Sequence, residues 1–342
     1  MSNKILVTGG TGFIGSHTVV ELQNAGYVPV IVDNLSNSSE KILDQIEKIT
    51  GVRPEFHNFD LCDEKKTKDF VSQNLDIVGV IHFAAFKAVG ESVQKPLEYY
   101  RNNFYSLINL LTAYSKSRVN FVFSSSCTVY GQPDVLPVTE EAPIKKAQSP
   151  YGNTKQISEE ILEEYSAVHP DLKVTSLRYF NPVGAHETAL IGELPMGVPQ
   201  NLVPFITQTA IGKREKLTVY GNDYDTPDGS CVRDYIHVVD LAKAHVAAIK
   251  RMEQQTEGSN YDVFNIGTGK GSTVLEAINA FETVSGEKLN YVIGPRREGD
   301  VEKVYGDVAK SNEELGWKTE LDINEMMRSA WAWEKYIQQN PL

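Results

Sequence analysis

The first half of the chain alternates short apolar runs with longer amphipathic stretches. The runs predict strands over residues 4–8, 28–33, 55–58, 77–83, 119–124 and 172–178. Several of them are apolar at every position, as strands are when both faces of a sheet are covered. The stretches between them predict helices over residues 14–26, 37–50, 64–73, 96–117 and 151–168. This βαβ rhythm indicates an α/β fold built on a doubly wound parallel sheet.

The rhythm changes after Asn181 and Pro182, where loops rich in Gly and Pro begin. Patterned segments resume at residues 202–211, 217–220, 239–252, 261–266, 274–285 and 322–338. We therefore predict a first domain over residues 1–180 and a smaller, mixed α/β C-terminal domain over residues 181–342. Segments after residue 230 could return to the first sheet, so the boundary stays open in that region.

A glycine-rich turn follows the first predicted strand. Gly9, Gly12 and Gly15 stand between that strand and an amphipathic helix. Glycines at this spacing permit a tight turn, a close approach of the backbone to a pyrophosphate and close packing of helix on strand. The pattern predicts a Rossmann-type dinucleotide site, and the alternative interpretation is a purely structural turn.

The second predicted strand ends in Asp33, where an acid accepts hydrogen bonds from the hydroxyls of an adenine ribose. Asp33 also repels a 2′-phosphate, and Asn34 and Leu35 follow where NADP binding would favour an arginine. NAD is therefore the predicted cofactor. Asp60, after the third strand, suits an adenine contact, although an acid in this place is more often a turn residue or a helix N-cap.

Tyr151 and Lys155 lie four residues apart in a predicted helix that begins near Pro150. An ammonium beside a phenol favours the phenolate, which lowers the pKa of the tyrosine and makes it a candidate base for an alcohol proton. The alternative is a half-buried tyrosine beside a solvated lysine. The glycine turn and the serine-rich strand end at Ser124 to Ser126 favour the catalytic interpretation.

Charge and cysteine content narrow the class of protein. The chain of 342 residues has 45 acidic and 33 basic side chains, a formal charge of −12, which disfavours nucleic acid as a partner. We expect no membrane association and a cytoplasmic location, because no run approaches the roughly 18 to 20 apolar residues of a span and no signal-peptide pattern is present. Three cysteines without paired spacing and seven histidines without a cluster predict no metal.

Longer strings carry a family resemblance. These are HFAAFKAVGES at 82–92, KPLEYY at 95–100, RYFNPVGAH at 178–186, RDYIH at 233–237 and PRREGD at 295–300. Together with the glycine turn and the Tyr-Lys pair, they resemble the UDP-glucose 4-epimerase (UDP-galactose 4-epimerase) family of the extended short-chain dehydrogenase/reductase superfamily. The resemblance extends from residue 4 to about residue 335.

The resemblance implies interconversion of UDP-galactose and UDP-glucose, with a tightly held NAD as a transient hydride store. It implies that Tyr151 takes the proton of the hydroxyl on the fourth sugar carbon. It also implies that Lys155 lowers the pKa of Tyr151 and holds the nicotinamide ribose, and that Ser126 hydrogen-bonds the reacting oxygen. The 4-keto sugar then turns within its pocket before the hydride and the proton return.

Two sets of binding residues follow from the resemblance. The implied NAD contacts are Gly9, Gly12, Phe13, Ile14, Gly15, Asp33, Asn34, Leu35, Ser36, Asn37, Ser38, Asp60, Leu61, Phe83, Ala84, Ala85, Lys87, Asn102, Ser126, Tyr151, Lys155 and Tyr179. The implied UDP-sugar contacts are Lys87, Ser126, Tyr151, Phe180, Asn181, Asn201, Leu202, Thr218, Val219, Tyr220, Arg233, Arg297, Asp300 and Val304. A homodimer that pairs the 96–117 helix and the Tyr151 helix with their mates is also implied.

Val304 occupies a position where some members of the family carry a bulky tyrosine and others a small residue. Our hypothesis is that valine leaves room for an N-acetyl group, so that UDP-GalNAc and UDP-GlcNAc are also interconverted. A shift of one residue in the comparison would place Tyr305 there and reverse this prediction.

Two other functions share the same motifs. A nucleotide-sugar 4,6-dehydratase requires an Asp-Glu pair after the serine strand, where this chain has Cys127 and Thr128. A non-enzymatic NAD-sensing protein on the same fold often lacks the Tyr-Lys pair, which this chain keeps.

Overall fold

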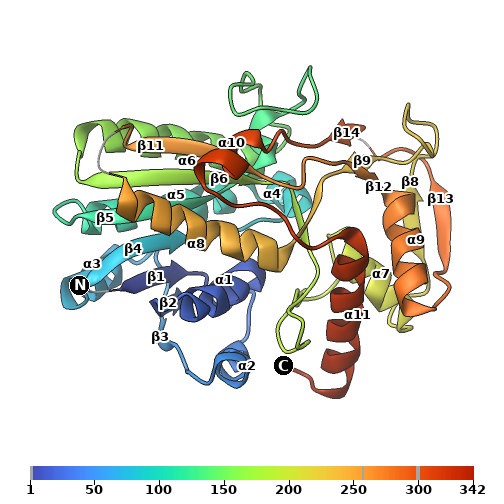
Figure 1. Cartoon of the computed structure of the whole chain (residues 1–342), viewed down its shortest axis with the longest axis horizontal. Coiled ribbons are helices and arrows are strands. Elements are labelled where there is room, and N and C mark those ends of the chain that lie inside the picture. Colours follow the sequence, from blue (N-terminus) through green and yellow to red (C-terminus); the bar gives the residue numbers. More distant parts are fainter. Residues whose placement is uncertain (1–2, 256–257, 298–300) are drawn as a thin grey trace.

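A seven-stranded parallel sheet forms the larger part of the molecule (Figure 1). The computed structural model describes residues 3–255, 258–297 and 301–342. In spatial order the strands are β11 (Tyr261–Ile266), β6 (Leu172–Tyr179), β5 (Val119–Ser126), β4 (Ile77–His82), β1 (Lys4–Thr8), β2 (Val28–Asp33) and β3 (Glu55–Asn58). The predicted doubly wound parallel sheet is confirmed.

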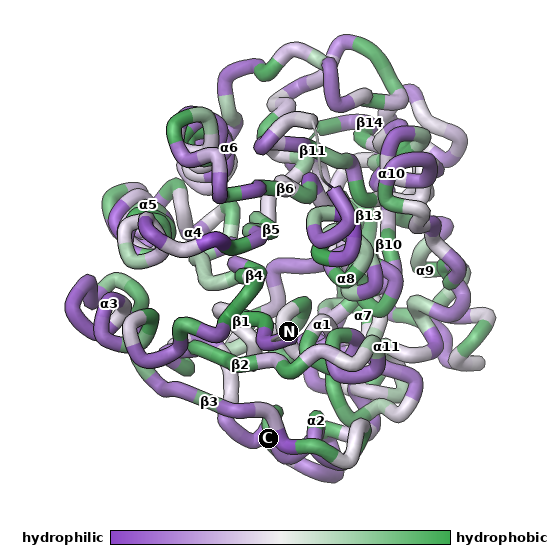
Figure 2. Tube along the Cα trace, turned by 60° about the vertical axis from the view of Figure 1, so that its left-hand side comes forward, coloured by the Kyte–Doolittle hydropathy of each residue, from purple (hydrophilic) through white to green (hydrophobic). Residues whose placement is uncertain are grey.

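Helices cover both faces of this sheet. One face carries α1 (Phe13–Asn24), α2 (Lys41–Thr50) and α8 (Val238–Gln254), and the other carries α3 (Glu64–Gln73), α5 (Pro96–Ala113) and α6 (Pro150–Val168). Successive strand residues point to opposite faces, so Ile5 and Val7 join the first core and Leu6 joins the second. Figure 2 shows the apolar positions concentrated along the central strands.

The chain enters the second part of the molecule after β6 and returns to the sheet further on. Helix α8 packs on α1, and β11 pairs with β6, so these two elements belong to the first sheet and its helical layer. A separate core, which includes Ile206, Phe281 and Trp331, lies among α7 (Leu202–Ala210), α9 (Val274–Ser285) and α11 (Ile323–Gln339).

Short strands complete the second part. They are β7 (Asn181–Val183) with β10 (Tyr235–His237), β8 (Leu217–Tyr220) with β13 (Tyr291–Gly294), and β9 (Val232–Arg233) between β12 (Ser272–Thr273) and β14 (Lys303–Val304). Helix α10 (Ala309–Glu314) follows them. Because these strands are two to four residues long, period-two patterning detects them poorly.

Several predicted boundaries are wrong by a few residues. Helix α2 begins at Lys41 rather than residue 37, because the Asp33 carboxylate holds the preceding loop through Leu35 N and Ser38 Oγ. Helix α5 ends at Ala113, four residues before the predicted end at 117. Strand β5 continues through the three serines to Ser126. Helix α4 (Val89–Gln94) and the 3-10 turn η1 (Cys127–Tyr130) were not predicted.

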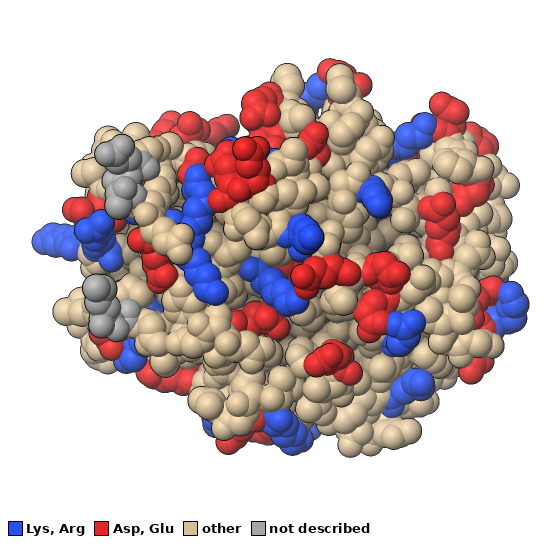
Figure 3. All heavy atoms as spheres, in the orientation of Figure 1, with Lys and Arg blue, Asp and Glu red and all other residues tan. Residues whose placement is uncertain are grey.

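Charged side chains of both signs are intermixed on the face in Figure 3. Within the part of the chain that the structure describes, no helix is both long enough and apolar enough to cross a membrane.

Candidate active site

The order in which successive strands are added to the sheet reverses between the neighbouring strands β1 and β4: β2 and β3 extend the sheet to one side of β1, and β4, β5 and β6 extend it to the other. At such a point the following loops diverge and leave a crevice at the carboxyl ends of the strands. The glycine turn, Phe83 to Ala85, Ser124 to Ser126 and Tyr179 all stand at these strand ends. The topology therefore brings together predicted site residues from four separate strands.

The glycine turn leaves no room for larger residues. Gly9 has a φ of 71°, and a Cβ there would lie 3.0 Å from the nitrogen of Ala84. A Cβ at Gly15 would lie only 2.2 Å from the carbonyl oxygen of Gly9. Gly12 precedes α1, and no side chain caps the helix, so the amides of its first turn are available to a ligand. This arrangement fits the pyrophosphate of a dinucleotide.

We expect Gly15→Ala to abolish retention of NAD, because the added methyl group would collide with the backbone at Gly9 and open the turn. The measurement is the amount of nucleotide released per chain when the purified protein is denatured. Gly90→Ala is the control, since a Cβ at Gly90 would meet only the side chain of Gln200, at 4.0 Å. A full nucleotide content in Gly15→Ala would contradict the assignment.

Asp33 ties the second strand to the glycine turn. Its carboxylate accepts hydrogen bonds from Thr11 N at 3.2 Å, Leu35 N at 2.9 Å and Ser38 Oγ at 3.3 Å. A carboxylate offers about four acceptor positions, so these three bonds leave capacity for a ribose hydroxyl. The same contacts order the loop of residues 34–38.

The Asp60 loop lies beside α5. Asp60 Oδ1 accepts from Cys62 N at 2.8 Å, as in an Asx turn, and Asn102 contacts the Cys62 thiol. The carbonyl of buried Leu61 accepts from the side chain of Asn109 at 2.8 Å. The structure therefore brings Asn102 close to Asp60 and Leu61, although Asn102 stands about 40 residues further along the chain.

Ser126, at the carboxyl end of β5, lies near Tyr151 and Lys155, in the first turns of α6. The hydroxyl of Ser149 caps α6 by accepting from Gly152 N, and Pro150 occupies the first turn, so the sequence itself sets where the helix starts. Buried Lys155 donates from Nζ to the carbonyl oxygen of Ser124 at 2.5 Å. Its Nζ lies 5.9 Å from the ring centroid of Tyr151.

The pKa values of Tyr151 and Lys155 both depart from the ordinary values of a phenol and an ammonium. Burial raises the pKa of Tyr151 to about 12, against a hydrogen bond from Ser126 that lowers it. Burial also lowers the pKa of Lys155 to about 7, and the carboxylate of Glu159 raises it. Lys155 was expected to lower the pKa of Tyr151, but the pKa is raised, because loss of solvent outweighs the hydrogen bond from Ser126.

Lys87 and Asn201 are joined by Glu193, which the sequence analysis missed. Glu193 Oε1 lies 3.4 Å from Lys87 Nζ and accepts from Asn201 Nδ2 at 2.5 Å. Lys87 Nζ also lies 6.0 Å from the ring of Phe13, at the start of α1. This bridge connects the loop after β4 with the N-cap of α7, at the junction of the two predicted binding sets.

Two arginines stand in the second part of the molecule. Arg233 on β9 pairs with Val304 on β14, and the guanidinium of Arg297 lies 5.8 Å from the ring of Tyr220. Thr218, Val219 and Tyr220 form β8, Leu202 begins α7, and Asn181 pairs with Tyr235. Asp300 lies outside the described residues.

Val304 and Tyr305 point in different directions. Val304 is partly buried and packs against a small apolar cluster that includes Phe180 and Val129. The ring of Tyr305 instead lies against Gly271, where a Cβ would come within 3.2 Å of it. Of the two residues, Val304 is the one that packs against the cluster of Phe180, a predicted UDP-sugar contact.

Two buried polar groups behind the site were also missed. Glu159, one turn after Lys155, accepts from Arg178 at 2.6 and 3.0 Å and from Ser125 Oγ at 2.5 Å. Asp234, next to Arg233, accepts from Thr268 N at 2.8 Å and Gly269 N at 3.2 Å. The spacing of Tyr151, Lys155 and Glu159 on one helix face was a usable signal for Glu159. Asp234 lies within the family string at 233–237, but no spacing pattern distinguishes it there.

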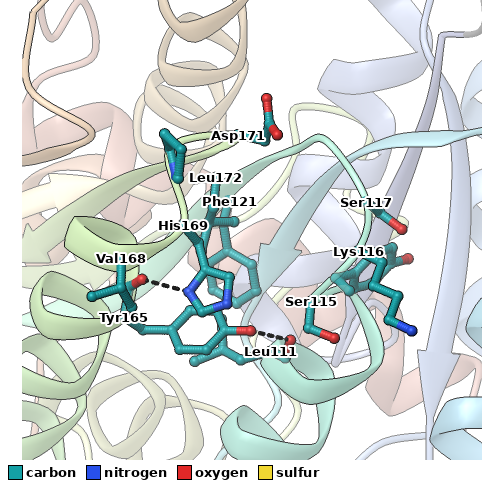
Figure 4. A pocket seen from close by; sticks show the side chains of 12 residues that line it. Leu111, Ser115, Lys116, Ser117, Phe121, Tyr165, Val168, His169, Asp171 and Leu172 are labelled. Atoms are coloured by element: carbon teal, nitrogen blue, oxygen red, sulfur yellow. Dashed lines mark hydrogen bonds between the residues drawn. The ribbon is translucent and has the colours of Figure 1, made fainter.

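A cavity of about 160 Å³ lies at the opposite end of the sheet (Figure 4). Its wall includes Phe121 and Leu172, near the starts of β5 and β6, and Tyr165, which donates to the carbonyl of Leu111 at 3.1 Å. The catalytic candidates stand at the other ends of these strands, so this cavity is separate from the crevice.

A Rossmann-type sheet with a glycine turn and a Tyr-Lys pair beside strand-end serines defines the extended short-chain dehydrogenase/reductase class. The family model described as GDP-mannose 4,6 dehydratase matches residues 6–330. The UDP-glucose 4-epimerase of Dictyostelium discoideum is 50% identical over 335 residues, which cover 98% of this chain and 96% of that protein.

Solved structures give the same result. The UDP-glucose 4-epimerase of Bifidobacterium longum, in complex with NAD⁺ and UDP, is 49% identical, with a TM-score of 0.92 and 99% of each chain covered. That of Stenotrophomonas maltophila, with bound NAD and formylated UDP-arabinopyranose, is 45% identical, with a TM-score of 0.94, covering 98% of this chain and 99% of that one. The chain belongs to the UDP-glucose 4-epimerase family.

Proposed function

We propose that this chain interconverts UDP-galactose and UDP-glucose, with NAD as its resident cofactor. The observation that carries the proposal is the group of three side chains at the strand ends, where Lys155 Nζ lies 5.9 Å from the ring of Tyr151 and Ser126 hydrogen-bonds the phenol. The glycine turn beside it fits a dinucleotide, and the relatives with this arrangement are epimerases.

The residues of the chain act on one proton and one oxygen. Tyr151, as phenolate, takes the proton from the hydroxyl on the fourth sugar carbon, and Ser126 hydrogen-bonds the same oxygen. NAD, when bound, supplies a reversible acceptor for the hydride on that carbon. The 4-keto sugar turns in its pocket and presents its other face, and Tyr151 returns the proton, so the centre is inverted.

Lys155 has two tasks in this scheme. It holds the ribose next to the nicotinamide, and its ammonium favours the phenolate of Tyr151 electrostatically. Burial raises the pKa of Tyr151 to about 12, so the phenolate needs added positive charge beside it. The oxidised nicotinamide is a cation and suits this requirement.

The UDP-sugar is proposed to bind between the two parts of the molecule. Arg233 and Arg297 offer planar forks of donors that suit a diphosphate, and they offset the repulsion between an acidic protein and an anionic substrate. Lys87 and Asn201, bridged by Glu193, stand where the NAD and sugar sets meet. Phe180 and Val304 supply an apolar wall.

The two rival functions fit the site less well. A 4,6-dehydratase needs an acid to eliminate water, but Cys127 stands in that place, and burial raises the pKa of this thiol to about 12. Burying the ammonium of Lys155 near Tyr151 costs solvation free energy. A protein that only binds NAD, without catalysis, gains nothing in return for that cost. Both considerations favour the epimerase.

The direct test is to supply the purified protein with UDP-galactose and no added cofactor, and to follow UDP-glucose. We expect conversion to an equilibrium mixture, because the resident NAD is restored in each turnover. If no product forms even after NAD is added, the epimerase proposal is wrong and the sensor becomes the leading alternative.

We expect Val304→Tyr to abolish conversion of UDP-GalNAc while UDP-galactose conversion continues. Val304 packs against the apolar cluster of Phe180, so a larger side chain there would fill the space proposed for an N-acetyl group. The two substrate pairs are assayed side by side on the variant. Equal loss on both pairs would argue against the hypothesis, as would failure of the native chain to use UDP-GalNAc.

A homodimer is part of the proposal. The outer face of α5 carries exposed apolar residues, with Leu97 80%, Tyr105 49% and Ile108 44% accessible. Such a stripe suits a partner helix, and a second copy of the chain would place α5 and α6 against their mates. Light scattering should give twice the chain mass of 38.1 kDa.

We propose residues 1–180, joined by α8 and β11, as the NAD-binding domain and the remainder of residues 181–342 as the nucleotide-sugar domain. A cytoplasmic location is supported by the three free thiols, Cys62, Cys127 and Cys231.

A further inference from the structure

Tyr179, the last residue of β6, is hydrogen-bonded to a histidine of α8. Its hydroxyl hydrogen-bonds Nε2 of His245, whose side chain is fully buried. Nδ1 of the same ring lies 2.8 Å from the carbonyl oxygen of Leu241. The ring of Phe83, at the end of β4, lies 4.7 Å from the imidazole, so His245 contacts two residues of the predicted NAD set.

The hydrogen-bond partners of His245 determine which nitrogen of its imidazole ring carries the proton. A carbonyl oxygen only accepts hydrogen bonds, so Nδ1 must be the donor to Leu241. Burial lowers the pKa of His245 to about 3, so the ring is neutral near pH 7 and Nε2 has no hydrogen. The hydroxyl of Tyr179 therefore donates to Nε2, and this direction cannot reverse without breaking the bond to Leu241.

Because the Tyr179 hydroxyl donates its hydrogen to His245, its oxygen can only accept further hydrogen bonds. A phenol oxygen has one hydrogen and two lone pairs. Burial raises the pKa of Tyr179, so the phenol keeps its hydrogen near pH 7. With that hydrogen donated to His245, the lone pairs of the oxygen remain as acceptors, at a strand end that pairs with the end of β5 at Ser126.

We propose that His245 is a positioning residue that makes the Tyr179 hydroxyl an obligate hydrogen-bond acceptor for the carboxamide N–H of NAD. This inference rests on the proposed function, because it takes NAD as the ligand of the crevice. The nicotinamide end of NAD carries a primary carboxamide, whose N–H groups need an acceptor. A hydroxyl free to rotate would offer its hydrogen to that group in part of the population and weaken the contact.

The test is the rate at which bound NAD exchanges with labelled NAD added to the holoenzyme. We expect His245→Leu and Tyr179→Phe each to accelerate exchange roughly tenfold, the range of one lost hydrogen bond. The double variant should stay within about twofold of either single variant, because both changes remove the same contact. Rates that multiply in the double variant, or an unchanged rate in His245→Leu, overturn the proposal.

Two conservative variants keep the test decisive if His245→Leu does not fold. Glutamine can place an amide oxygen near the position of Nε2, whereas asparagine reaches only the position of Nδ1. His245→Gln should therefore hold NAD nearly as well as the native chain, and His245→Asn should not; equal or reversed exchange rates overturn the proposal. If the native chain binds no NAD, the proposed function itself has failed, which is a different outcome.

Discussion

Tyr151→Phe should lose turnover of UDP-galactose by a factor of about 10² to 10⁴, the usual contribution of a general acid-base group. The phenol oxygen is the atom that Ser126 hydrogen-bonds, and Lys155 Nζ lies 5.9 Å from the centroid of the same ring. Removing it leaves the glycine turn untouched, so NAD content should remain at the native level. The measurement is kcat for UDP-glucose formation together with nucleotide content.

The control for this prediction is Tyr100→Phe. Tyr100, on α5, accepts from Asn153 Nδ2 at 2.9 Å, so its hydroxyl also contacts α6 but stands outside the proposed catalytic group. Turnover of Tyr100→Phe should stay within a few-fold of native, since loss of one neutral hydrogen bond costs about 1 kcal/mol. Unchanged turnover in Tyr151→Phe would refute the assignment of the base.

Arg178→Met should lower the free energy of unfolding by about 3 to 5 kcal/mol, because it leaves the Glu159 carboxylate buried without its cation. The two side chains are 6% and 9% exposed, and the pair joins β6 to α6 behind Lys155. The measurement is urea denaturation followed by circular dichroism, with the NAD concentration held constant.

Two further variants show whether the loss of stability comes from the broken ion pair or from the altered packing of the side chains. The double variant Arg178→Met with Glu159→Leu should recover most of the loss, because apolar side chains can replace a buried ion pair at little cost. Arg53→Met breaks the exposed pair with Asp44, where the side chains are 43% and 53% exposed, and should cost less than about 1 kcal/mol. A double variant as unstable as Arg178→Met alone would show that packing dominates.

Features set by local contacts were predictable from the sequence. The glycine turn, the start of α6 at Ser149 and Pro150, and the placement of Tyr151 and Lys155 on one helix face depend on residues a few positions apart. The parallel sheet follows from repeated apolar runs of strand length. The family strings then supplied the function, which a fold by itself does not determine.

Contacts between distant segments were decided only by the tertiary structure. Glu193 reaches Lys87 across 106 positions, and His245 reaches Tyr179 across 66, so neither pair has a periodic signal in the chain. Burial also reversed the expected shift in the pKa of Tyr151, because desolvation depends on everything packed around a group. The sequence alone thus determined the chemistry present at each strand end and helix start, and folding decided which of those groups meet and how far water is excluded from them.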